Sequence, residues 1–247
     1  GVVKQLFRPA DSDDLQQFLQ QLEDDEQLVW VGLGSNLLVR DGGYKGSVIL
    51  TKGRLQQFEI NGDMLCAQAG VSCAKAARES AKQGYCGLEF FAGIPGTIGG
   101  ALAMNAGAFG CETWEHVLKV ETIDRHGAIR TRPPEDFDVR YREVTGPADE
   151  YFLGGWFRLQ QGDASKSQLK IRRLLERRAH TQPTTQASCG STFRNPEGDF
   201  AARLIESAGL KGYCIGGACV SEKHANFIIN QGNASATDIE QLIGYIQ

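Results

Sequence analysis

The sequence predicts an α+β fold in two units, a larger one over residues 1–163 and a smaller one over residues 164–247. Its 247 residues suit one or two domains of ordinary size. Many short apolar runs bounded by turn residues come first, which is typical of strands. Helical patterns become more frequent after a strongly basic segment that starts near residue 164. This change of pattern places the boundary near 162–165.

The composition excludes several classes of protein. The 26 Lys and Arg residues against 30 Asp and Glu give a net charge of -4, which argues against a general nucleic-acid binder. No apolar run approaches the roughly 20 residues of a membrane span. The seven cysteines are odd in number and none has CxxC spacing, so we expect neither a disulfide framework nor a metal site. We expect a cytoplasmic protein, and a monomer.

Periodicity and turn residues predict the elements of the first unit. A helix is expected over residues 11–23, because Leu15, Leu19 and Leu22 share one face and Ser12 can act as the N-cap. A second helix over 72–83 ends at Gly84. Strands are expected at 28–33, 45–50, 58–62, 64–70, 117–123, 128–132 and 151–160.

The second unit begins with a basic helix over 164–180, which Pro183 closes. Its Lys and Arg side chains are typical of a solvated face, and one or two of them could also reach a diphosphate. Ser235 and Asp238 resemble a capping box. Further helices are expected at 199–208 and 235–246, and strands at 214–220 and 226–230.

The 30 glycines gather in a few segments, where the main chain must turn tightly or approach a ligand closely. The first is the turn from Gly32 to Val39, whose main-chain N–H groups could bind a phosphate. It fits neither a Rossmann nor a Walker A motif, and a plain structural turn is an equal alternative. The second segment, 93–110, lies within a stretch from 87 to 110 that lacks a regular period. It suits a long, flat ligand against main chain, although bulges and barrel corners also use glycine.

The two segments together, Val-Gly-Leu-Gly-Ser-Asn-Leu-Leu-Val and Gly-Ile-Pro-Gly-Thr-Ile-Gly-Gly-Ala, resemble the flavin-binding domain of the vanillyl-alcohol-oxidase type. Within that superfamily the chain resembles the UDP-N-acetylenolpyruvoylglucosamine reductase family. Three further stretches carry this resemblance, at 141–142, 190–196 and 208–230. The resemblance implies a two-lobed FAD-binding domain over 1–163 and a substrate-binding domain over 164–247.

The resemblance implies a function as well. The family uses NADPH and non-covalent FAD to reduce the enolpyruvyl ether of UDP-N-acetylglucosamine to UDP-N-acetylmuramate, a peptidoglycan precursor required for cell shape and cell division. The small-molecule substrate and NADPH are then the only expected partners. The positions implied to bind the cofactor are Gly32, Gly34, Ser35, Asn36, Leu37, Gly70, Gly93, Pro95, Gly96, Thr97, Gly99, Gly100, Asn105 and Ala106.

Reduction of the double bond leaves a carbanion, so the reaction needs a cation at the substrate carboxylate and a proton source. The resemblance gives these roles to Arg142 and Ser191, although local sequence alone would also fit a surface ion pair and a turn or cap residue. His116 and His126 have no such context and are expected at the surface. The substrate-binding residues implied are Tyr141, Arg142, Asn195, His224 and Asn226.

Two departures from the family are visible. A catalytic Glu near the family's C-terminus has no match, because the chain ends at Gln247 and Glu240 lies on the preceding helix. An N-terminal Arg-Gly-Gly segment is also missing before Gly1, and we expect both to be losses from this chain. The strand at 151–160 leads directly into the basic helix, as in the subtype without an inserted substrate loop. A flavin-dependent alcohol or sugar oxidase and a non-catalytic nucleotide-binding module remain the alternative functions.

Overall fold

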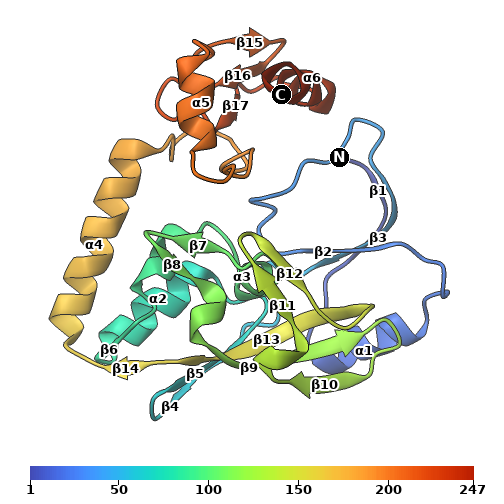
Figure 1. Cartoon of the computed structure of the whole chain (residues 1–247). Coiled ribbons are helices and arrows are strands. Elements are labelled where there is room, and N and C mark those ends of the chain that lie inside the picture. Colours follow the sequence, from blue (N-terminus) through green and yellow to red (C-terminus); the bar gives the residue numbers. More distant parts are fainter. The chain divides into compact units, whose positions relative to one another are not determined.

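A computed structural model describes all residues from Gly1 to Gln247 and confirms the α+β class (Figure 1). The chain divides into two compact units. The larger unit contains residues 4–33 and 45–175, and the smaller unit contains 1–3, 34–44 and 176–247. The division between 175 and 176 falls inside helix α4 (Ala164–Thr181), and the loop at 34–44 belongs to the smaller unit. None of the helices is both long enough and apolar enough to cross a membrane.

The larger unit is built on a five-stranded antiparallel sheet in the order β10-β9-β13-β5-β4 (Figure 1). Val120 and Ile123 are three residues apart on β9, which pairs with β10 and β13, so their side chains lie on opposite faces of the sheet. Each is buried in a different hydrophobic cluster. The strands are β4 (Phe58–Asn61), β5 (Met64–Gln68), β9 (Val117–Asp124), β10 (Ile129–Arg132) and β13 (Glu150–Arg158).

Helices cover the two clusters. Ala76 of α2 (Cys73–Lys82) and Leu102 of α3 (Ile98–Ala103) are buried with Val120. Leu15 and Leu19 of α1 (Ser12–Gln20) are buried with Ile123. The helix at the start of the chain is confirmed, but its N-cap is Asp11, whose side chain accepts from the Asp14 N–H, and not Ser12.

Several elements of the larger unit had no clear signal in the sequence. A three-stranded sheet has the order β1-β3-β2, with β2 and β3 parallel. The segment from residue 87 to 110, expected to lack a regular period, contains a short helix, α3. Strands β2 (Leu28–Val31) and β3 (Tyr44–Leu50) confirm the strands expected at 28–33 and 45–50. The elements without a clear signal are β1 (Val3–Phe7), β6 (Tyr85–Cys86), η1 (Glu89–Gly93), β7 (Gly107–Ala108), β8 (Cys111–Glu112), η2 (Thr113–His116), η3 (Pro134–Asp136), β11 (Asp138–Arg140), β12 (Glu143–Thr145) and β14 (Gln160–Gln161).

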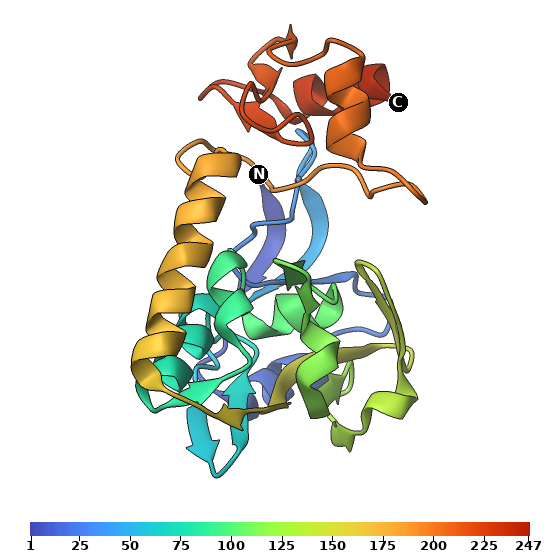
Figure 2. The same ribbon diagram turned by 60° about the vertical axis from the view of Figure 1, so that its left-hand side comes forward.

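The smaller unit contains an antiparallel sheet, β15-β16-β17, with α5 and α6 packed against it (Figure 2). The predicted strand at 214–220 is in fact a hairpin, because Gly216 and Gly217 turn the chain. Its two cysteines, Cys214 and Cys219, form a disulfide, so the expectation of no disulfide was wrong for this pair. The capping box of Ser235 and Asp238 is confirmed. The elements are α5 (Ala201–Ser207), β15 (Cys214–Ile215), β16 (Ala218–Val220), β17 (Ile228–Asn230) and α6 (Ala236–Ile246).

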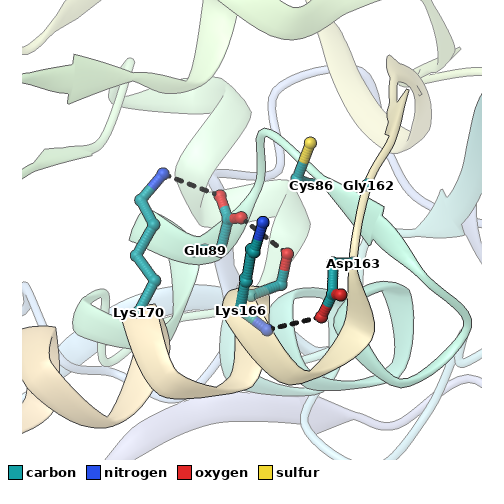
Figure 3. A pocket seen from close by; sticks show the side chains of 7 residues that line it. Cys86, Glu89, Gly162, Asp163, Lys166 and Lys170 are labelled. Carbon is teal, nitrogen blue, oxygen red and sulfur yellow. Dashed lines mark hydrogen bonds and ion pairs between the residues drawn. The ribbon is translucent and has the colours of Figure 1, made fainter.

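A buried carboxylate holds the first turns of α4 to the larger unit. Glu89, on η1, is only 3% exposed and accepts hydrogen bonds from Ser167 Oγ at 3.1 Å and from Lys170 Nζ at 3.1 Å (Figure 3). The Gly87 N–H donates to the same carboxylate at 3.0 Å. Burial raises the pKa of Glu89, but hydrogen bonds from its own main-chain N–H, from Lys170 and from the Gly87 N–H, together with the Lys170 charge, outweigh it, so the pKa lies below its ordinary value. Since η1 leads directly into the second glycine segment, this anchor also fixes where that segment begins.

We expect Glu89→Gln to lower the free energy of unfolding by about 1–3 kcal/mol at pH 7, because the amide loses the charge-assisted bond to Lys170. The depressed pKa of Glu89 means that this contribution is present above the unfolded value of 4.5 and is lost as the pH falls through the folded value. Urea unfolding at pH 7 and pH 3 measures both. Glu79→Gln is a matched control, since its pair with Lys82 is exposed. An equal loss of stability at both pH values would contradict the prediction.

Candidate active site

The first glycine segment contacts the second within the larger unit. A Cβ on Gly32 would lie 2.3 Å from Thr97 Oγ1, so only glycine allows this approach. Thr97 is 2% exposed, and its hydroxyl has no hydrogen-bond partner. Thr97 is also the N-cap of α3, yet its side chain does not cap the helix. A buried hydroxyl without a partner is costly, so a ligand with a polar atom at this point would satisfy it.

Three of the glycines predicted to approach a cofactor are required by packing within the protein itself. A Cβ on Gly70 would lie 1.7 Å from a main-chain oxygen, that of Arg54. A Cβ on Gly93 would lie 2.4 Å from the Phe109 ring. A Cβ on Gly99 would lie 2.8 Å from the Cβ of Ala69, on the turn that follows β5. These residues shape the segment, whether or not main chain at these points also touches a ligand.

Gly100 differs from these three. The nearest atom to a Cβ on Gly100 is Thr97 Oγ1, at 3.9 Å, so the space beside it is open. Gly100 is exposed. Open main chain next to the unpartnered Thr97 hydroxyl is the part of the segment that best fits a bound cofactor.

The remaining cofactor positions of this segment bond to the protein. The Gly96 carbonyl accepts from the Cys73 N–H at 3.0 Å, and the Ala106 carbonyl accepts from Thr113 Oγ1 at 2.6 Å. Pro95 has no polar side-chain atom. The Asn105 side chain is 2% exposed and fully used, as its Nδ2 donates to Glu112 Oε2 and to the Arg140 carbonyl, while its Oδ1 accepts from the Trp114 N–H. Asn105 therefore holds the segment in place through side-chain bonds within the protein.

Arg142 occupies a conformation that favours glycine. Tyr141 and Arg142 are the two turn residues between β11 and β12, and Arg142 has a φ of 55°. Such a residue at the second turn position costs roughly 1 kcal/mol relative to glycine. The Asn105 bond to the Arg140 carbonyl, 3.2 Å long, ties this turn to the glycine segment. An arginine kept at a strained position points to a use for its side chain.

In the smaller unit, Ser191 lines a cavity of about 530 Å³ together with Asn36 and Leu37. The cavity thus brings a predicted proton donor together with two predicted cofactor residues. Gly34, just before them, has a φ of 70°, which the turn requires. Sequence reasoning missed the rest of the lining, although Cys189 stands two residues before Ser191: it comprises Leu38, Ala187, Ser188, Cys189, Thr192, Ile228, Asn230, Ile239 and Ile243.

Three predicted substrate residues of the smaller unit bond to the protein and do not line this cavity. Asn195 Oδ1 accepts from the Ala201 N–H at 3.1 Å and so caps the start of α5. Asn226 is 4% exposed and bonds through its amide to the main chain of Phe193. His224 is half-buried, and its Nδ1 accepts from the Asn226 N–H at 3.3 Å. Burial lowers the pKa of His224, with a smaller effect from Lys211 in the same direction.

A second cavity, of about 330 Å³, lies beside the Glu89 anchor, and no predicted site residue lines it (Figure 3). Lys170 of the basic helix is engaged here with Glu89. His116 is nearby and half-buried, with its ring stacked on Phe90 at 5.4 Å, so the expectation of a surface residue was wrong. Burial lowers the pKa of His116. His126 is exposed, as expected.

Comparisons with known proteins agree on both units. The family model "FAD binding domain" matches residues 3–132, and "UDP-N-acetylenolpyruvoylglucosamine reductase, C-terminal domain" matches residues 182–247. Curated reductases of that name from Alkalilimnicola ehrlichii and Legionella pneumophila are each 57% identical over 100% of this chain, and cover 83% and 81% of the relatives. The crystal structure of the Thermus caldophilus enzyme matches 98% of this chain and 87% of its own, with a TM-score of 0.87 and 31% identity.

The open space at Gly100 allows a test of cofactor approach that does not disturb the fold. Gly100→Ala should leave the protein as stable or more stable, by up to about 1 kcal/mol, because alanine favours a helix. It should weaken FAD binding at least tenfold if the cofactor lies against this main chain. Isothermal titration of the FAD-free protein measures the affinity. Gly99→Ala is the matched comparison and should instead lower the melting temperature. Unchanged FAD affinity in Gly100→Ala would show that the cofactor does not approach here.

Proposed function

The chain belongs to the UDP-N-acetylenolpyruvoylglucosamine reductase family, and from this premise we propose how its own residues carry the reaction. It is an FAD-dependent oxidoreductase that uses NADPH as reductant. Its reaction converts UDP-N-acetylglucosamine enolpyruvate to UDP-N-acetylmuramate, a precursor of peptidoglycan. The observation that carries the function is the 57% identity to curated reductases over the whole of the chain.

The cofactor fits the larger unit at the unpartnered Thr97 hydroxyl and the open main chain of Gly100. Bound FAD would supply the redox chemistry that links the oxidation of NADPH to the reduction of the enolpyruvyl double bond. Thr97 would donate a hydrogen bond to the cofactor, and Gly32 leaves room for that hydroxyl. The residues shaped by packing, Gly70, Gly93 and Gly99, would keep the segment in register for this contact.

Arg142 is proposed to bind the substrate carboxylate. Its guanidinium offers a planar pair of N–H donors that suits a carboxylate, and its positive charge stabilises the enolate-like charge that develops as the hydride arrives. The strained turn supports this role, since glycine would suit the backbone better. Tyr141, which is 48% exposed, would extend the same surface for the substrate.

Ser191 is proposed to deliver the proton to the carbanion carbon. An alcohol is a weak acid, but a carbanion is a strong base, so transfer is downhill when the hydroxyl is close and water is excluded. Its cavity supports this role, because Leu37, Ile228 and Ile243 make much of the wall apolar. The cofactor residues Asn36 and Leu37 line the same cavity.

We also propose a cytoplasmic monomer that acts on small molecules and supports cell shape and division through the cell wall. The net charge of -4 favours a small-molecule enzyme over a nucleic-acid binder. Light scattering of the purified protein would test the oligomeric state.

Replacing Arg142 by glycine should lower the activity without lowering the stability. Arg142→Gly should be neutral or stabilising by up to about 1 kcal/mol, because it relieves the positive φ. It should reduce kcat/KM for the enolpyruvyl substrate at least tenfold, the loss expected for a charge-assisted bond. Asp149→Gly is the matched control, since Asp149 has the same φ of 55° and no proposed role. Full activity in Arg142→Gly would remove Arg142 from the mechanism.

Ser191→Ala should separate the two halves of the reaction. Bleaching of the flavin band by NADPH needs no proton for a substrate carbon, so its rate should stay within about twofold. The return of colour on adding the enolpyruvyl substrate should slow by about 10²–10⁴-fold. Ser191→Cys should recover part of this rate, because a thiol can also give a proton. Stopped-flow absorbance follows both steps. Equal slowing of both steps would mean that Ser191 is structural.

A further inference from the structure

The segment that carries Ser191 has no regular secondary structure, so a few hydrogen bonds determine its position. Gly190, directly before it, has a φ of 80° and open space on its Cα, and provides no packing. Ser191 forms an isolated bridge with Phe227, and the Thr192 N–H donates to the Asn226 carbonyl at 2.8 Å. The bonds to residues 226 and 227 therefore contribute to the alignment of Ser191.

The Asn226 side chain adds two more bonds to this alignment. Its Oδ1 accepts from the Phe193 N–H at 2.8 Å, and its Nδ2 donates to the Phe193 carbonyl at 2.9 Å. The amide thus pairs with both polar groups of one residue, as a neighbouring strand would. With Asn226 4% exposed, water cannot readily replace these bonds.

His224 in turn holds Asn226. The ring Nδ1 accepts from the Asn226 N–H at 3.3 Å, and the ring packs edge-on against Phe227 at 4.8 Å. The turn is closed by the Phe227 N–H, which donates to the His224 carbonyl at 3.0 Å. Accepting at Nδ1 requires the neutral ring with its proton on Nε2, because a protonated ring has no lone pair to offer.

Burial of the ring is the largest effect and lowers the pKa of His224, outweighing a main-chain hydrogen bond that raises it. Lys211 lowers the pKa and Glu206 raises it, and these two groups form an ion pair of 2.7 Å, so their effects partly cancel. The ring is therefore neutral at pH 7. In mildly acidic solution a proton on Nδ1 would point at the Asn226 N–H, so the hydrogen bond would be lost. The ring or the turn would then have to move.

We propose that His224 and Asn226 are positioning residues for Ser191, and that a proton on the His224 ring slows proton delivery to the substrate but leaves the NADPH step unchanged. The inference rests on the proposed function, in which Ser191 is the proton donor. Neither residue lines the Ser191 cavity, so their effect passes through the main chain of residues 191–193. A role in binding substrate directly would instead appear in KM.

The structural half of the proposal is tested without turnover. In ¹⁵N-labelled protein, the main-chain amides of Thr192, Phe193 and Asn226 should shift between pH 8 and pH 5 with the same midpoint as the His224 ring. In His224→Asn, whose amide oxygen can accept in place of Nδ1 at every pH, this shift should disappear. The proposal would be overturned if the amide shifts of Thr192 and Phe193 did not change with the midpoint of the His224 ring. This outcome does not depend on the result for Ser191→Ala.

The kinetic half uses the two stopped-flow steps. The substrate step should fall below the His224 midpoint, approaching tenfold for each pH unit, while the NADPH step stays flat. In His224→Asn the substrate step, taken relative to its own rate at pH 8, should lose this fall. Asn226→Asp should slow the substrate step at least tenfold at pH 8, because a carboxylate cannot donate to the Phe193 carbonyl. A fall that persists in His224→Asn, or a change confined to KM, would overturn the proposal.

Discussion

The two segments that carry the proposed catalytic residues, Arg142 and Ser191, depend on hydrogen bonds to main-chain polar groups that lie outside regular secondary structure. The turn of Arg142 and the segment of Ser191 have few ladder bonds, and buried groups left unpaired would be costly. A buried asparagine meets this need in each unit. Asn105 bonds to the Arg140 carbonyl and the Trp114 N–H, and Asn226 bonds to both polar groups of Phe193. Each side-chain amide bonds to main-chain N–H and C=O groups in the way that the main chain of a neighbouring strand would.

The two side chains proposed to take part in the reaction, Arg142 and Ser191, need different surroundings, and the fold provides both. A guanidinium remains charged anywhere, so Arg142 can stand half-exposed on a hairpin turn, where it can reach a carboxylate. A serine hydroxyl gives up its proton only to a strong base that water cannot reach. Ser191 accordingly lines a cavity whose wall is largely apolar, and Asn226 and His224, outside this lining, are buried and half-buried.

Much of the fold could be predicted from local pattern. Helices α1, α2, α4 and α6 have apolar periodicity and end signals, and the structure places them within three residues of the expected bounds. Helix α3 was missed because Gly99 and Gly100 are poor helix formers, and contact with Ala69 supports it instead. The disulfide was missed because an odd total count does not reveal a pair five residues apart on a hairpin.

The site could be predicted as a set of positions but not as a set of contacts. A motif shows that an asparagine or glycine is present, but it does not show whether that residue faces a ligand or the protein. The side chains of Asn195, Asn105 and Asn226 form hydrogen bonds to main-chain groups of the protein, and only the three-dimensional structure shows this. Arg142 is the opposite case, because its positive φ is visible only in three dimensions and strengthens a role that the sequence had implied.

The packing glycines have a consequence for how this protein family changes over evolutionary time. Gly70, Gly93 and Gly99 are held by collisions that any side chain would cause, with or without a bound ligand. A descendant that had lost its activity would still need these glycines in order to fold. Arg142, in contrast, could be replaced by glycine, which its positive φ favours. The glycine pattern is thus a marker of ancestry, whereas under the proposed mechanism Arg142 and Ser191 would mark the difference between a working enzyme and an inactive copy.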